Sequence, residues 1–465
     1  MKRKMQISQI AIIAILIVSV LGLVLVSCKR GPEKRKAIVD SHVEHPEWSK
    51  NAVIYEVNVR QYTPEGTFKA FQEHLPRLKE MGVDIIWLMP IHPIGMEKRK
   101  GELGSYYSIQ DYKAVNPEFG NIDDFKELVE KAHEMGMYMI LDWVANHTAW
   151  DHAWVVEHPE WYMKNKEGEM ESPHDWTDVV ELDYKVEDVH SAMLDDMKFW
   201  VKETDIDGYR CDVAGEVPVG FWNEAREELD KIKPVFMLAE SEQPNHHVHA
   251  FDMTYSWELH HIMNEIAKGN KNARDIDKYF IKHDTIYPVE AYRMHFITNH
   301  DENSWNGTEY ARMGDAVNTF AVLTFTLPGM PLIYSGQEAA IKDTLRFFEK
   351  DTIQWGNFEL SDFYRDLADL RKSNQALWSG EYGGAYKRIK TSDNENIYAF
   401  VRRYDDNAVF VMANLSPNVT GFNFKDGGKK KEFTDWSDGS SFVLEPGMYM
   451  SMNPWEYRIF VVNRD

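Results

Sequence analysis

Short apolar runs alternate with amphipathic stretches along most of the chain, from residue 53 to about residue 372. The apolar runs are rich in β-branched and aromatic residues, which predicts buried β-strands. Strands are predicted at residues 53–61, 83–89, 138–144, 208–213, 235–239, 252–257, 294–298 and 332–334. Eight strands with intervening helices are typical of a closed parallel barrel, the (β/α)8 or TIM barrel of the α/β class.

The stretches between the predicted strands carry apolar residues at helical spacing. Phe71, Leu75 and Leu78, for example, share one face of residues 68–81. Helices are predicted at residues 68–81, 122–135, 193–204, 221–232 and about 362–372. An open doubly wound sheet is the alternative, but the strand count and the absence of a Gly-rich phosphate-binding loop favour the closed barrel.

Two segments depart from this alternation. The interval between the third and fourth strands is about twice as long as one βα unit needs, so residues 148–205 are predicted to form an inserted subdomain within a barrel of residues 48–375. Residues 376–465 contain alternating strand-like runs separated by Gly, Asn and Asp, among them 397–403, 408–414 and 457–462. This pattern predicts a C-terminal antiparallel β-sandwich.

The first residues have the pattern of a targeting segment. A basic start is followed by the apolar run 10–26, which ends at a Ser-Cys pair containing Cys28. This end resembles a bacterial lipobox, so residues 1–27 are predicted to be a lipoprotein signal peptide, Cys28 the lipidated residue and residues 28–47 a tether. An uncleaved membrane anchor is the alternative. Both interpretations place the protein outside the cytoplasm, in the cell envelope of a bacterium, on the outer membrane or the cell surface.

Charge and cysteine content narrow the range of partners. The formal net charge is −23, which argues against nucleic acid because phosphate binding needs clustered Lys and Arg. A neutral substrate suits such a chain. The only cysteine besides Cys28 is Cys211, so acylation of Cys28 leaves no disulfide within one chain. No feature of the sequence fixes an oligomeric state.

Polar side chains cluster where the predicted strands end. Four strands lead into such residues, which are Asp142 on the third with Asn146 and His147 after it, Arg210 and Asp212 on the fourth, Glu240 after the fifth, and His300 and Asp301 after the seventh. Strand ends of a barrel converge on one mouth, where the active sites of this architecture lie. A single acid there is more often a helix cap or an ion-pair partner. Four strands ending in this way favour an active site.

These segments resemble the signature motifs of glycoside hydrolase family 13, the α-amylase family. The motifs D-x-V-x-N-H (142–147), G-x-R-x-D (208–212), a glutamate after the fifth strand (Glu240) and N-H-D (299–301) occur in the family's order. Tyr107 resembles the tyrosine on which the family stacks a sugar ring. The resemblance covers residues 48–465.

The resemblance implies a role for each residue of the site. Asp212 would be the nucleophile, Glu240 the general acid and base, and Asp301 the third carboxylate, which binds sugar hydroxyls. Substrate contacts would come from Tyr107, Asp142, His147, Arg210 and His300. Two carboxyl groups divide acetal cleavage between nucleophilic attack and proton transfer, so the chemistry requires no cofactor and retains the anomeric configuration. The implied substrate is starch or a maltooligosaccharide, cleaved at its α-1,4-glucosidic bonds.

A structural calcium ion is a further implication. Asn146 matches a usual calcium ligand of the family, and the inserted segment offers the oxygen donors Asp175, Asp178 and Asp183. However, Asp212 is followed by Val213 and Ala214, where many α-amylases carry a Lys-His pair that contributes to this calcium site. A calcium-bound and a calcium-free subdomain both remain open.

Other functions compatible with the sequence differ in chemistry. An α-glucosidase or a transglycosylase on short maltooligosaccharides would use the same covalent intermediate. A starch-binding surface lipoprotein would need no catalysis, yet all three carboxylates are present. A metal-dependent hydrolase using Asp142, His147 and Asp301 lacks paired histidines at ligand spacing.

Overall fold

The computed structural model describes residues 40–425 and 430–462, all within one compact unit that spans residues 38–465. The predicted signal peptide 1–27, Cys28 and most of the predicted tether lie outside these residues. Within the two described ranges, every helix is too short or too polar to cross a membrane.

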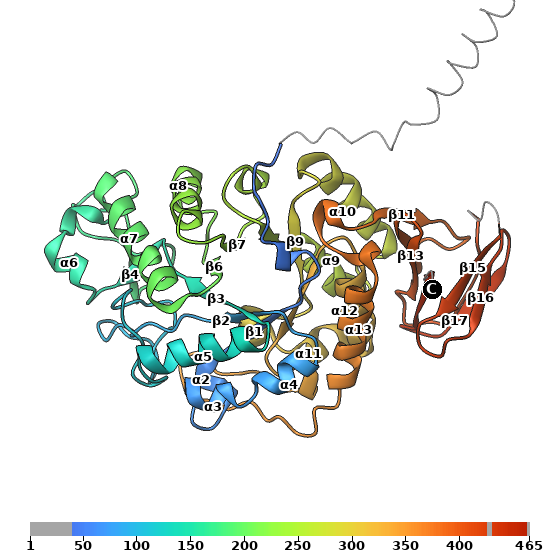
Figure 1. The fold of residues 1–465 in the computed structure, drawn as a ribbon, viewed down its shortest axis with the longest axis horizontal. Helices are drawn as coiled ribbons and strands as arrows, with labels where there is room; N and C mark the ends of the chain where they lie inside the picture. The colour runs from blue at the N-terminus through green and yellow to red at the C-terminus, as the bar shows by residue number, and fades with distance from the viewer. Residues whose placement is uncertain (1–39, 426–429, 463–465) are drawn as a thin grey trace, which may run out of the picture. The chain divides into compact units, whose positions relative to one another are not determined.

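Eight parallel strands close into a barrel at the centre of this unit, which confirms the predicted fold class (Figure 1). Their order around the barrel is β1-β10-β9-β8-β7-β6-β3-β2. The strands are β1 (Ile54–Val57), β2 (Ile85–Leu88), β3 (Tyr138–Trp143), β6 (Gly208–Cys211), β7 (Phe236–Ala239), β8 (Met253–Tyr255), β9 (Tyr292–His295) and β10 (Met330–Tyr334). The barrel is closed at β1, because Ile54 pairs with Ile85 of β2 on one side and with Leu332 of β10 on the other.

Side chains alternate between the inside and the outside of the barrel. Ile54, Ile140 and Leu238 belong to the cluster that fills the interior, whereas their neighbours such as Tyr55 and Leu141 pack outward against the helices. Two positions further along these strands, Glu56, Asp142 and Glu240 also point inward, and Arg210 of β6 is in register with Asp142. The strand period therefore directs charged side chains to one mouth of the barrel.

Helices surround the barrel and bury its outer face. They are α2 (Val59–Tyr62), α3 (Phe68–Gln72), α4 (Leu75–Glu80), α5 (Ile122–Glu134), α7 (Glu187–Thr204), α8 (Val219–Asp230), α9 (Trp257–Ala267), α10 (Ala273–Ile286), α11 (Glu309–Met313), α12 (Val317–Thr326) and α13 (Ser361–Ser373). The predicted helix 68–81 is two helices in the structure. The second helix begins next to Pro76, which lies in the first turn of α4. Proline has no amide hydrogen to donate within a helix, so it is favoured in a first turn, where that donor is not needed.

An insertion leaves the barrel after β3. Its strands β4 (His147–Ala149) and β5 (Val179–Glu181) form an antiparallel pair, and α6 (Ala153–Glu157) lies between them in sequence. The next helix, α7, contacts α5 and α8 and so belongs to the ring around the barrel. The insertion proper therefore ends before α7.

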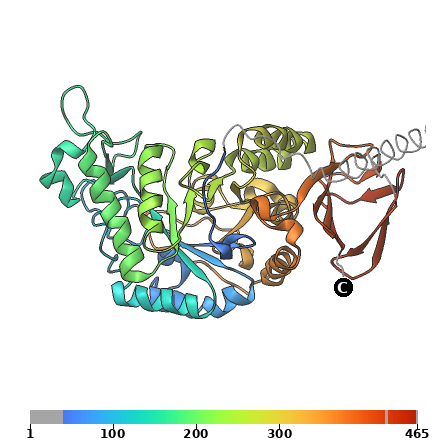
Figure 2. The same cartoon turned by 45° about the horizontal axis from the view of Figure 1, so that its top comes forward.

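A β-domain follows α13, coloured red in Figure 2. Its six-stranded sheet has the order β11 (Ala385–Ile389), β12 (Ile397–Tyr404), β13 (Asn407–Asn414), β18 (Tyr457–Val462), β15 (Lys431–Asp435) and β16 (Ser441–Leu444), and β14 (Thr420–Asn423) pairs with β17 (Tyr449–Met452) in a second sheet. Phe410, Phe422, Phe460 and Met452 form the core between the two sheets.

Candidate active site

Arg210 lies at the centre of a buried cluster of carboxylates. Its Nη1 donates hydrogen bonds to Asp142 Oδ1 at 2.8 Å and to Asp212 Oδ1 at 2.9 Å, and its Nε donates to the Tyr255 hydroxyl at 3.1 Å. Its Nη2 lies 2.9 Å from Glu240 Oε2, an ion-pair contact without the angle of a hydrogen bond. One guanidinium thus positions three acids that are distant in sequence.

Gly208 explains how β6 and β7 approach closely enough for this arrangement. Its φ is +146°, and a Cβ atom at this position would lie 1.9 Å from the Phe236 carbonyl oxygen on β7. Only glycine fits. The first residue of the G-x-R-x-D motif therefore has a structural role, and the Arg and Asp of that motif carry the charges.

Asp142 is held from two sides. Besides Arg210, the Trp87 indole and the Tyr107 hydroxyl donate to its Oδ2, at 3.2 and 3.0 Å. Asp142 has no exposed surface, and burial raises its pKa to about 6, against the opposing charges of Arg210 and His300. Through these contacts Asp142 holds Tyr107 and Arg210 in position.

His300 connects this network to the first strand. Its Nδ1 lies 2.5 Å from Glu56 Oε1, and its Nε2 lies 2.7 Å from the Tyr107 hydroxyl and 3.3 Å from Asp301 Oδ2. The neighbouring carboxylates Asp301 and Glu56 outweigh burial and raise the pKa of His300 to about 9. The imidazole is therefore charged at neutral pH, with both ring nitrogens as donors.

Three carboxylates of the cluster reach solvent. The exposed fractions of the Asp212, Glu240 and Asp301 side chains are 10%, 14% and 36%. Burial raises the pKa values of Asp212 and Glu240 to about 7, and Arg210 acts in the opposite direction on both. The pair therefore retains a proton close to neutral pH, as acid catalysis requires.

The remaining predicted substrate residues, Tyr107 and His147, lie beside this cluster. Tyr107 stacks on the His300 ring, with 5.5 Å between the ring centroids. His147 begins β4 in the insertion and is 2% exposed. Burial lowers its pKa to about 3, so the ring is neutral, and it contacts Asn146 at 3.4 Å and the backbone of Tyr107.

Two of the predicted calcium ligands, Asp178 and Asp183, already have partners within the protein. Asp178, 5% exposed, is paired with Lys100, whose Nζ lies 2.8 Å from Asp178 Oδ1. Asp183 Oδ1 accepts from the backbone amide of Lys185. Across residues 40–425 and 430–462, no three His, Cys, Asp or Glu side chains are grouped as metal ligands. The ammonium group of Lys100 supplies the positive charge that a cation would otherwise bring to Asp178.

The structure adds residues that the sequence pattern did not single out. Glu56 is fully buried and reaches His300 from the end of β1, and Tyr255 contacts Arg210 from β8. Glu56 carried a weak signal, because it is an acid inside an otherwise apolar strand. Phe347, in the loop after β10, stacks on Tyr107 at 6.2 Å, and no local pattern marks it.

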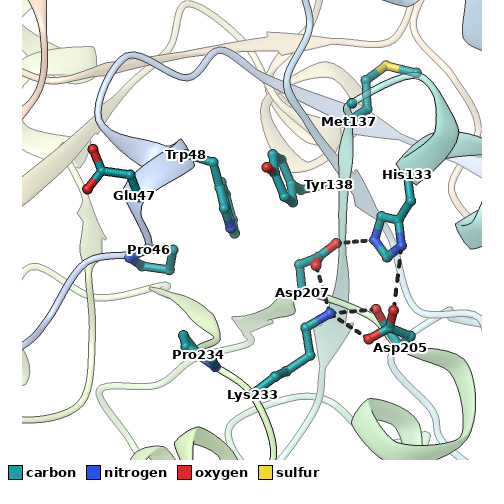
Figure 3. Close-up of a pocket in the computed structure, with 11 residues that line it drawn as sticks. Pro46, Glu47, Trp48, His133, Met137, Tyr138, Asp205, Asp207, Lys233 and Pro234 are labelled. Carbon is teal, nitrogen blue, oxygen red and sulfur yellow. Dashed lines mark hydrogen bonds and ion pairs between the residues drawn. The ribbon is translucent and has the colours of Figure 1, made fainter.

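A cavity of about 420 Å³ lies at the other end of the barrel (Figure 3). Its polar side chains satisfy one another, since His133 lies 2.8 Å from Asp207, and Lys233 contacts Asp205 and Asp207 at 2.7 and 3.0 Å. Tyr138, the first residue of β3, also lines it. The cavity is therefore at the amino-terminal ends of the strands, away from the carboxylate cluster.

Family models match almost all of the described chain. The model described as "Alpha amylase, catalytic domain" matches residues 41–181 and 157–398. The model described as "Maltogenic Amylase, C-terminal domain" matches residues 388–459. Both the barrel and the C-terminal β-domain thus have counterparts in one group of enzymes.

Individual relatives agree with these models. The α-amylase MalA of Haloarcula japonica is 27% identical over 81% of this chain, which spans 57% of that protein's length. The maltogenic α-amylase of Bacillus acidopullulyticus is 23% identical over 89% of this chain and 78% of its own length. Among solved structures, the maltogenic α-amylase AmyB of Thermotoga neapolitana has a TM-score of 0.82 at 30% identity, covering 90% of this chain and all of that one. An α-amylase of Lactobacillus plantarum has a TM-score of 0.79 at 29% identity, with the same coverage of the two chains.

Proposed function

The chain belongs to the α-amylase family of glycoside hydrolases, and from this premise we propose that it cleaves α-1,4-glucosidic bonds of starch or maltooligosaccharides with retention of configuration. The observation that carries the proposal is the shared contact of Arg210 with Asp212 and Glu240 at the mouth of the barrel. A nucleophile and an acid held by one group can act on the two atoms of a single bond.

In the first step, Asp212 attacks the anomeric carbon. Arg210 occupies its Oδ1, which leaves Oδ2 as the attacking oxygen. Glu240 donates its proton to the glycosidic oxygen as the carbon–oxygen bond breaks, and the leaving sugar departs with a hydroxyl group. The product of this step is a glycosyl ester on Asp212.

In the second step, the ionised Glu240 removes a proton from water. The water oxygen attacks the anomeric carbon, and the Asp212 carboxylate is released. Each step inverts the configuration at the anomeric carbon, so the two steps together retain it. Asp301 Oδ2 and Nε2 of the charged His300 lie 3.3 Å apart, and in this proposal they supply an acceptor and a donor for sugar hydroxyls.

The test replaces Asp212 with Asn and compares the variant with the wild type on soluble starch and maltoheptaose. Loss of the nucleophile lowers kcat by roughly 10⁴-fold or more. Asp369→Asn is the control, because Asp369 is exposed on α13. Undiminished activity of Asp212→Asn overturns the assignment, and a wild type that binds starch without cleaving it indicates a binding lipoprotein instead.

The products of maltoheptaose distinguish the related activities. A ladder of short oligomers indicates cleavage inside the chain, whereas glucose alone indicates an α-glucosidase. Oligomers longer than maltoheptaose show that a sugar hydroxyl, and not water, intercepts the glycosyl ester on Asp212, as in a transglycosylase.

Lipid anchoring at Cys28 is a separate part of the proposal, and it is supported by the sequence of residues 1–28. The expected result is incorporation of labelled fatty acid into the wild type, with the protein in the membrane fraction. Cys28→Ala abolishes the label. If Cys28→Ala stays in the membrane fraction at unchanged mass, the segment is an uncleaved anchor.

A further inference from the structure

A line of aromatic side chains leads from the carboxylate cluster to the surface. Tyr107 stacks on Phe347 with 6.2 Å between centroids and only 10° between the ring planes. Phe347 in turn contacts Trp305 at 5.2 Å. Tyr107 and Phe347 are half-buried, whereas Trp305 is 57% exposed. Packing within the protein buries much of the Tyr107 and Phe347 rings, whereas more than half of the Trp305 surface stays exposed to solvent.

The segments that carry these rings are fixed in place. Asn303 Oδ1 accepts a hydrogen bond of 2.8 Å from the backbone amide of Leu345, which joins the segment after β9 to the loop after β10. The Phe348 carbonyl accepts a hydrogen bond of 2.8 Å from the Leu103 amide. The aromatic rings are therefore preorganised, and a ligand that stacks on them loses little free energy to ordering the protein.

The topology sets the direction of this line. Tyr107, Trp305 and Phe347 come from the loops after β2, β9 and β10, which surround β1 in the barrel. Glu240 follows β7, four strands from β1 in both directions around the barrel. The aromatic line therefore extends away from the proton donor.

The direction identifies which part of a substrate can occupy the line. Glu240 protonates the leaving sugar, so the leaving side of a glucan lies toward β7. The glucose units that stay attached to Asp212 extend the opposite way. Sugar rings present C–H faces that stack on aromatic rings, and an exposed indole is a suitable surface for them.

From these observations, and resting on the proposed function, we infer that Phe347 and Trp305 form a binding subsite for the glycone side of an α-glucan, beyond the glucose unit that reacts. The subsite favours substrates that place two or more glucose units on that side of the cleaved bond. It therefore favours release of maltose or longer units over release of glucose from the non-reducing end.

The experiment compares the wild type, Trp305→Ala and Trp305→Phe on maltooligosaccharides labelled at the reducing end, from maltotriose to maltohexaose. Product analysis gives kcat/KM for each bond. In Trp305→Ala, kcat/KM falls roughly tenfold for bonds with two or more glycone units, the loss expected for one stacking contact. Bonds with a single glycone unit keep kcat/KM within about twofold, and Trp305→Phe keeps most of the wild-type selectivity.

Tyr449→Ala is the matched control, since Tyr449 is 65% exposed in the C-terminal domain. An unchanged bond preference in Trp305→Ala overturns the inference, as does an equal loss at every bond. A wild type that cleaves none of these substrates overturns the proposed function itself, and the subsite with it.

Discussion

Arg210 determines how charge is distributed among the acids of the site. It is fully buried and contacts Asp142, Asp212 and Glu240 within 2.9 Å. One positive charge cannot neutralise three carboxylates, so burial favours the binding of protons by the cluster. Arg210 donates hydrogen bonds to Asp142 and Asp212 but not to Glu240. The proton needed for catalysis is therefore expected on Glu240.

The pH dependence of activity follows from this distribution. Because the pKa of Glu240 is raised to about 7, kcat/KM on maltooligosaccharides falls as the pH rises through that value and the acid loses its proton. Maltosyl fluoride, whose leaving group needs no proton, is expected to show no such alkaline limb in the wild type or in Glu240→Gln. The limb persisting in the variant would assign it to another residue.

The same shift affects stability with a definite sign. A carboxyl group whose pKa is higher in the folded state than in the unfolded state binds more protons when folded. Its contribution to the free energy of unfolding is therefore largest below its ordinary pKa and is lost as the pH rises through about 7. Glu240→Gln removes the part of this dependence that Glu240 contributes, while Asp212 keeps its own, and urea unfolding across that pH range measures the difference.

Glu56 is expected to keep His300 charged. In Glu56→Gln the pKa of His300 falls from about 9 toward 6.5, because the 2.5 Å contact loses its negative charge. NMR titration of the imidazole measures this directly. We also expect kcat/KM at pH 6.5 to fall roughly tenfold, since a charge-assisted donor to the sugar is weakened.

Glu309→Gln provides the control for this substitution. Glu309 is 2% exposed, and burial raises its pKa to about 7, but it begins α11 and makes no contact with His300 in the described network. A shift of the His300 pKa in this variant as large as in Glu56→Gln would show that any buried glutamate has this effect, and would contradict the specific role of Glu56.

At the scale of elements, strand and helix types were predictable and their ends were not. The predicted strand 53–61 ends at Val57, and α2 follows it, because the alternation of apolar residues continues through the turn of helix. Strand β9 begins at Tyr292, two residues before the predicted start. Phe296 and Ile297 are buried beyond its end, so apolarity alone does not mark where pairing stops.

The pair between Lys100 and Asp178 joins the insertion to the loop after β2, and it gives a prediction about calcium. Lys100→Met leaves a nearly buried carboxylate without its partner and lowers the free energy of unfolding by about 2 kcal/mol. Millimolar calcium restores part of this loss in the variant, because the cation replaces the ammonium group. A chelator does not change the Tm of the wild type.

Lys126→Met is the control for this prediction. Lys126 and Glu203 form a pair in which both side chains are exposed, at 3.6 Å. Its loss costs about 0.5 kcal/mol or less. A chelator that lowers the Tm of the wild type would contradict the calcium-independent interpretation.

At the scale of the whole molecule, the barrel and the C-terminal domain share one core. Barrel helix residues such as Phe320 and Leu367 belong to the same buried cluster as Tyr398 and Val411 of the C-terminal sheet. Arg402, 2% exposed, donates to the carbonyl oxygens of Gly384, Thr326 and Trp378. We expect calorimetry to show one unfolding transition. Two separate transitions would contradict a shared core.

At this scale, part of the active site could be predicted from the sequence and part could not. The acids Asp142, Asp212, Glu240 and Asp301 could be predicted to meet, because the ends of parallel barrel strands converge whatever the loops do. The proximity of Phe347 and Trp305 could not, because it depends on how the loop after β10 packs against the short π-helix Glu302–Asn306 after β9. Lys100 likewise meets Asp178 only through the fold of the insertion.

The central claim is that Asp212 is the nucleophile of a retaining glycosidase, and trapping the intermediate tests it most directly. A 5-fluoro-α-maltosyl fluoride reacts through its fluoride leaving group, while the ring fluorine slows hydrolysis of the resulting ester. We predict that mass spectrometry of the digested protein locates one glycosyl group, on Asp212. Turnover of the reagent with the label on another residue, or with no labelled protein under conditions where the ester would accumulate, would contradict the account.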